Sequence, residues 1–111
     1  MTDTLLKKAL AKYVLHRVRQ NMQHERFPEH YNNLYNPIPE WKHKDYENLA
    51  GILNASTPTI KRLFNRPGYT NHQQFNNANK QLFIVFLGLN TWEEVEKEAL
   101  MFALKRGLMS E

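Results

Sequence analysis

Cysteine is absent from this chain of 111 residues, and long apolar runs are missing as well. The absence of cysteine excludes disulfides and thiolate metal sites, and it fits a reducing compartment. The longest apolar run, residues 82–89, is far shorter than the roughly 20 residues that a membrane-spanning helix needs. The chain does not open with the charged and apolar segments of a secretory signal. Together these absences predict a soluble, cytoplasmic protein that does not associate with membranes.

Acidic residues are missing from the middle of the chain. Residues 48–92 contain four basic residues and no Asp or Glu, which gives this stretch a net charge of +4. Residues 1–47 carry +2 and residues 93–111 carry −2, so the whole chain also has a net charge of +4. A surface without carboxylates can approach phosphate groups without like-charge repulsion. The pattern favours a nucleic-acid partner, although a net charge of this size is also common among soluble proteins.

No pattern typical of an enzyme is present. The five histidines are scattered, and the chain contains no HExxH motif, no glycine-rich phosphate loop and no nucleophile elbow. We therefore expect a protein that is not an enzyme and that has no cofactor and no metal site. The length fits one domain over residues 1–111, with an N-terminal part at 1–44 and a core at 45–107.

Apolar residues recur at helical spacing, and no segment has the alternation of a strand. The sequence therefore predicts an all-α fold, a compact bundle of about five helices that contains a helix-turn-helix. The expected helices cover residues 4–23, 44–53, 58–65, 71–88 and 91–106.

The second and third expected helices have the features of a helix-turn-helix. Ala50 is small enough for a close helix crossing, and Asn54 tolerates the left-handed conformation that ends a helix. Thr57 can cap the following helix, with Pro58 at its first position. The pattern predicts a DNA-binding helix pair, and the alternative is an ordinary corner between two helices.

The fourth and fifth expected helices also have recognisable ends. Asn71 with Gln74 resembles a capping box, and Gly88 supplies the stop. Thr91 with Glu94 forms a clearer capping box at the start of the fifth helix. The apolar face that we expect the fourth helix to bury consists of Phe75, Ala78, Leu82, Val85, Phe86 and Leu89.

A long connection rich in proline and aromatic residues follows the first helix, over residues 24–44. We expect a short helical turn near residues 29–34. Connections of this length are uncommon in compact domains and often have a function. Its large apolar side chains either pack across the core or form a surface that binds a protein partner.

Two segments resemble small bacterial helix-turn-helix modules. Residues 56–65, STPTIKRLFN, resemble their STLKRLFG segment, and residues 82–95, LFIVFLGLNTWEEV, are similar to their LAxFLGYxSWExF segment. The order of the helices is distantly similar to that of phage-repressor-like folds. The resemblance covers about residues 46–98 and implies an all-α fold of the DNA-binding type.

This sequence departs from the family pattern at three places. Pro58 stands where the family usually has a polar residue, and Asn65 replaces the usual glycine. The basic stretch before the fourth helix has become rich in Asn and Gln, which removes phosphate contacts of the kind the family uses.

If the third helix enters the major groove, Lys61 and Arg62 are expected to point outward. Arg62 could then read guanine and Asn65 adenine, while Thr57, Thr59 and Lys61 contact phosphates or methyl groups. The alternative for Lys61 and Arg62 is plain surface charge, and for Gln73 it is helix capping. The full set of expected DNA contacts is Ser56, Thr57, Thr59, Lys61, Arg62, Asn65, Arg66, Asn71, Gln73 and Lys80.

The leading hypothesis from the sequence is a protein that binds double-stranded DNA and regulates transcription. One such module makes few contacts, so a homodimer that reads two half-sites is expected. The rival hypothesis is a helical interaction module, for example a phage or mobile-element adaptor, which has kept the fold but binds a protein partner through residues 24–44. Pro58 and the small number of basic side chains on the third helix favour this rival.

Overall fold

The computed structural model describes residues 3–64 and 75–106, and these residues contain no strand. The predicted all-α fold is therefore confirmed. The five α-helices are α1 (Asp3–His24), α2 (His43–Leu53), α3 (Thr57–Leu63), α4 (Asn77–Leu87) and α5 (Trp92–Lys105). Two short 3-10 helices, η1 (Glu29–Tyr35) and η2 (Ile38–Glu40), lie between α1 and α2.

Three predicted helix ends are confirmed. Asn54 ends α2 in the left-handed conformation with φ 57°, and Gly88 ends α4 with φ 71°. Thr91 caps α5, because its side-chain oxygen accepts a hydrogen bond of 3.2 Å from the backbone N–H of Glu94. These ends are set by local chemistry, which is why sequence alone identifies them.

The starts of α3 and α4 differ from the prediction. Ser56, not Thr57, caps α3, and Pro58 is the second residue of that helix. Helix α4 begins at Asn77, six residues later than expected, with the Asn76 side chain as its cap. The predicted capping pair of Asn71 and Gln74 lies outside the described residues.

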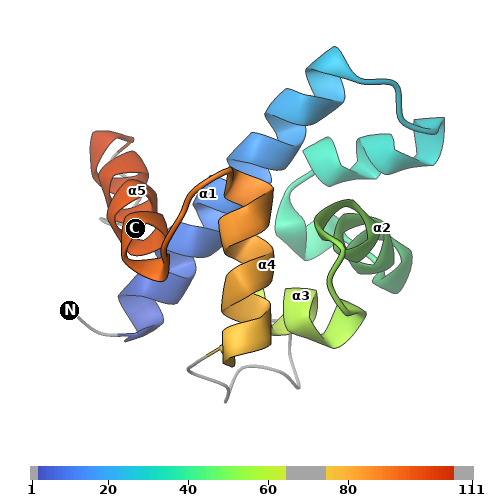
Figure 1. Ribbon diagram of the computed structural model, residues 1–111. Coiled ribbons are helices and arrows are strands. Elements are labelled where there is room, and N and C mark those ends of the chain that lie inside the picture. The colour runs from blue at the N-terminus through green and yellow to red at the C-terminus, as the bar shows by residue number, and fades with distance from the viewer. Residues whose placement is uncertain (1–2, 65–74, 107–111) are drawn as a thin grey trace.

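Helix α1 is central to the packing. It lies beside α5, where the centres of the Tyr13 and Phe102 rings are 5.4 Å apart. It also contacts α3. In Figure 1, α5 and the α2–α3 pair lie on opposite sides of α1 and α4. The largest fully buried side chains are Leu10, Val14, Val18, Leu34, Leu49, Ile60, Leu63, Phe83 and Val95.

Side-chain hydrogen bonds hold the connection between α1 and α2 in place. Arg19 of α1 donates two hydrogen bonds to it, from Nε to the carbonyl of Leu34 (2.9 Å) and from Nη2 to that of Asn36 (3.1 Å). The indole of Trp41 donates to the same Asn36 carbonyl at 3.0 Å. Leu34 and Trp41 are buried, so a large part of the aromatic connection packs across the core. The expected helical turn near residues 29–34 is confirmed as η1.

Candidate functional site

The predicted recognition helix, α3, is covered on most of its sides. Thr59, Ile60, Lys61 and Leu63 are all buried, whereas Pro58 is exposed and Thr57 and Arg62 are half-buried. In helix-turn-helix proteins the N-terminal residues of the recognition helix contact the base edges in the major groove. Helix α3 has only seven residues and lies against both α1 and α2. This geometry does not present a long recognition face.

The expected outward orientation of Lys61 is wrong. Only 9% of Lys61 is exposed, and its ammonium lies 2.8 Å from Nδ1 of His43 on α2. The other ring nitrogen of His43 lies 3.4 Å from a carboxylate oxygen of Glu47. Lysine can bury its long stem along apolar surface and reach a polar partner with its end, and that explains the difference.

Arg62 is turned toward α1. It is half-buried, and its Nε is buried with no hydrogen-bond partner among the described residues. Burial, followed by the positive charge of Arg62, lowers the pKa of Lys7 on α1. Arg62 is therefore less exposed than predicted, and its positive charge lies near Lys7 where α1 contacts α3.

The remaining described members of the predicted site have local roles. The hydroxyl groups of Ser56 and Thr59 form a hydrogen bond with 2.7 Å between their oxygens, and Ser56 also caps α3. Thr57 is half-buried beside them. Lys80 places its ammonium 5.5 Å from the centre of the Trp92 ring. The other predicted contacts, Asn65, Arg66, Asn71 and Gln73, lie outside the described residues.

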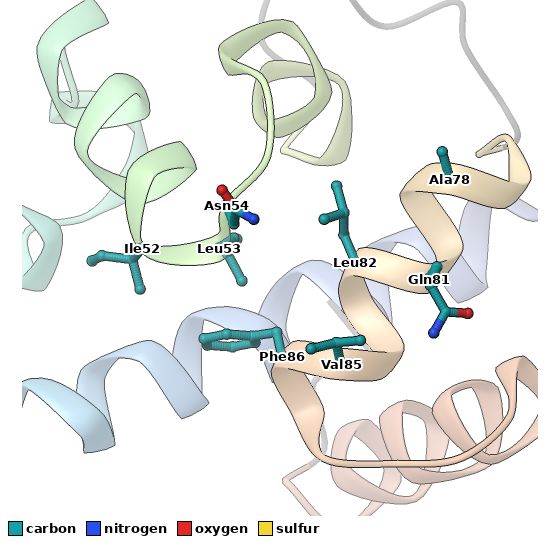
Figure 2. Close-up of a pocket in the computed structure, with 8 residues that line it drawn as sticks. All are labelled: Ile52, Leu53, Asn54, Ala78, Gln81, Leu82, Val85 and Phe86. Carbon is teal, nitrogen blue, oxygen red and sulfur yellow. The ribbon is translucent and has the colours of Figure 1, made fainter.

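A groove lies between the end of α2 and the length of α4. We call it the α2–α4 groove, and its volume is about 350 Å³. Figure 2 shows the α4 side chains along one wall and the end of α2 with the α2–α3 turn opposite them. The residues that line it are Ile52, Leu53, Asn54, Ala78, Gln81, Leu82, Val85 and Phe86.

The outer wall of this groove is unusually apolar for exposed surface. Val85 is 68% exposed, although it is a large aliphatic residue. Ala78 and Gln81 are also exposed on the same helix, while Leu82 and Phe86 are half-buried. An exposed apolar surface rimmed by polar groups is typical of an interaction site.

The chain segments that line the groove carry almost no charge. Within residues 51–56 and 76–90, only Lys80 is charged, and its ammonium lies over the Trp92 ring. In protein–protein interfaces the buried centre is depleted of charge in the same way. The groove therefore has the chemistry of a surface that buries an apolar partner.

The sequence did not reveal this groove, because the predicted buried face of α4 is only partly right. Phe75, Phe86 and Leu89 pack against the core as predicted, but Ala78 and Val85 do not. The buried residues of α4 are Phe83, Ile84 and Leu87. Ala78 and Val85, which belong to the predicted face, are exposed. Residues 82–87 are apolar without interruption, so the helix has apolar side chains on both faces. Periodicity cannot choose between two apolar faces. The uninterrupted apolar run was the only signal in the sequence, and it did not show which face would be exposed.

Two further observations concern metal binding and membrane spans. Within residues 3–64 and 75–106, no group of three or more His, Asp or Glu side chains is arranged to hold a metal ion. Among the helices of those ranges, none combines the length and the apolar character needed to cross a membrane. Comparison of the chain with protein families, with curated proteins and with solved structures gives no match.

Proposed function

We propose that this chain is a helical interaction module that binds an apolar helix of a protein partner in the α2–α4 groove. The observation that carries the proposal is Val85, a large aliphatic side chain that is 68% exposed on the wall of an apolar groove. The groove, and not residues 24–44, becomes the proposed partner surface, because much of that connection packs against the core.

Helix-in-groove recognition supplies the mechanism. A partner helix places apolar side chains at positions three, four and seven residues apart into a hydrophobic groove. Here Leu82 and Phe86 form part of one wall, and Ile52 and Leu53 stand across from them. Asn54 and Gln81 supply amide groups at the edge, which can orient the partner by hydrogen bonds.

Selection from a displayed library of amphipathic helical peptides tests the proposal. We expect enrichment of peptides with apolar residues at helical spacing, and binding about tenfold weaker or worse to Val85→Lys, a loss of about 1.4 kcal/mol or more. Leu104 on α5 provides a matched control, because it is 70% exposed but lies away from the groove. Leu104→Lys should bind the same peptides with unchanged affinity. Selected peptides that bind Val85→Lys as well as the natural chain would overturn the proposal.

A second proposed function is binding to duplex DNA as a transcriptional regulator. It is favoured by the absence of acidic residues from 48–92 and by the exposed Lys42 and Lys44 at the start of α2. In a helix-turn-helix the first helix crosses the DNA backbone, which is where these two lysines would contact phosphates.

Fluorescence anisotropy with random duplex DNA, across about 50–200 mM salt, tests this second function. We expect affinity to fall with salt and to fall further in the Lys42→Gln/Lys44→Gln variant. Lys97 and Lys105 on α5 are also exposed, so their double Gln variant is the charge-matched control. Lys61 and Arg62 are unsuitable for this test because they contribute to internal packing. If both double variants bind DNA with equal affinity, the start of α2 does not contact DNA.

A further inference from the structure

We infer that the helix bound in the α2–α4 groove is α4 of a second copy of this chain, in antiparallel orientation. This inference rests on the proposed function, since it requires that the groove binds a helix. It names the partner as the chain itself and places a two-fold axis near Gln81 and Leu82, the centre of the exposed face of α4.

The first argument concerns charge. A two-fold axis brings each surface against its own copy, so any charged patch on the axis meets a patch of the same sign. The described residues around the groove, 51–56 and 76–90, include Lys80 as their one charged member, and its ammonium is held over Trp92. In a chain with a net charge of +4, these two segments bring no charged side chain other than Lys80 toward a second copy.

The second argument concerns shape. Ala78 and Val85 are both exposed and are seven residues apart, which is about two helical turns or 10 Å along the axis. Antiparallel pairing about a centre between Gln81 and Leu82 places Val85 opposite the partner's Ala78. The large side chain then meets a small one at both ends of the contact, whereas parallel pairing sets Val85 against the partner's Val85.

The third argument concerns the polar groups at the edge. Gln81 is exposed beside the proposed axis, and Asn54 lies across the groove. An amide side chain carries both donors and an acceptor, so it can hydrogen-bond to an identical group. Ammonium or carboxylate groups cannot pair with their own copies in this way. Gln81, which lies beside the proposed axis, can therefore hydrogen-bond to Gln81 of the second copy.

Disulfide trapping of the full chain tests the arrangement, because the natural sequence contains no cysteine. Gln81→Cys should form a covalent dimer under mild oxidation at least about tenfold faster than Lys97→Cys, because an existing dimer holds the two thiols at high effective concentration. Lys97 is exposed on α5 and provides the control. Sedimentation of the natural chain should give twice the monomer mass.

A pair of charge substitutions then tests whether the two α4 helices are antiparallel. Ala78→Lys and Val85→Glu should each weaken the dimer, whereas the double variant Ala78→Lys/Val85→Glu should restore it. In the antiparallel arrangement each new lysine faces a new glutamate of the other copy, and in the parallel arrangement like charges meet. Both positions are exposed, so these variants should retain the helical circular dichroism of the natural chain.

The two proposals fail in distinguishable ways. Equal trapping of Gln81→Cys and Lys97→Cys, with a monomer mass in sedimentation, would overturn the self-association. If helical peptides still bound in a Val85-dependent manner, the groove would retain its proposed function with a different protein as its partner. If those peptides also failed to bind, both proposals would be overturned. Rapid trapping without restoration by the double variant would overturn the antiparallel arrangement.

Discussion

The ammonium of Lys61 lies 2.8 Å from Nδ1 of His43, so a hydrogen bond joins α3 to the first turn of α2. An ammonium group can only donate, which makes Nδ1 the acceptor and places the imidazole proton on Nε2. Nε2 in turn faces a carboxylate oxygen of Glu47 at 3.4 Å. The side chain that sequence reasoning assigned to a DNA interface thus belongs to the internal packing between α2 and α3.

Loss of Lys61 should destabilise the fold. Lys61→Ala removes a buried stem and a hydrogen bond to His43, and we expect the free energy of unfolding to fall by about 1–3 kcal/mol. Urea denaturation followed by circular dichroism measures this change. Lys97→Ala, at an exposed position, should change stability by no more than about 0.5 kcal/mol. Equal stability of the two variants would show that Lys61 does not support the α2–α3 contact.

Arg19 should be needed to hold the connection between α1 and α2. Arg19→Met keeps much of the apolar stem but removes the hydrogen bonds to the carbonyls of Leu34 and Asn36. We expect a loss of about 1–3 kcal/mol, because carbonyls that lose a charged donor become less well satisfied. The fluorescence of Trp41, which shares the Asn36 carbonyl, should change as well. Arg26→Met, at an exposed position, provides the control and should leave both readouts unchanged.

The left-handed conformation of Asn54 predicts opposite effects for two small substitutions. Asn54→Gly should be neutral or slightly stabilising in thermal denaturation, because glycine adopts φ 57° without steric cost. Asn54→Ala should cost about 1 kcal/mol, since a Cβ atom disfavours this region. A lower melting temperature for the glycine variant than for the alanine variant would contradict this account of the turn.

His16 should make the protein less stable in mild acid. Burial, followed by the positive charges of Arg106 and Arg17, lowers the pKa of His16 below its ordinary value of 6.5. The folded state therefore favours the neutral ring. The associated stability is fully present above the unfolded pKa of 6.5 and is lost as the pH falls through the lower folded pKa.

Urea denaturation at about pH 7.5 and pH 5.5 measures this effect, since the interval spans the ordinary titration range of histidine. His16→Phe keeps a ring against Phe102, whose centre lies 4.9 Å from that of His16, and it should lose less stability between the two pH values. His24→Gln, at an exposed position, should lose as much as the natural chain. An equal loss in the His16→Phe variant would contradict the prediction.

Sequence reasoning succeeded where local chemistry decides the structure. The ends at Asn54 and Gly88 and the cap at Thr91 depend on conformations available to single residues or short segments. The all-α fold follows in the same way from spacing within each helix. Side chains close in sequence carry enough information for these features.

The candidate site could not be predicted because it depends on contacts between distant segments. Lys61 is buried by helices whose positions no local pattern specifies. Helix α4 offers two apolar faces, and only packing against the other helices determines that Phe83 is buried and Val85 exposed. The groove exists because of that choice, so it becomes visible only when the helices are assembled.

The contact between α1 and α5 has a consequence for synthesis of the protein. A ribosome delivers α1 first, and the side of α1 around Tyr13 and His16 has to wait for Phe102 before it is covered. At about 5–20 residues per second, the chain between them takes several seconds to appear. During that interval this side of α1 lacks the aromatic ring of α5 that packs against it in the folded protein.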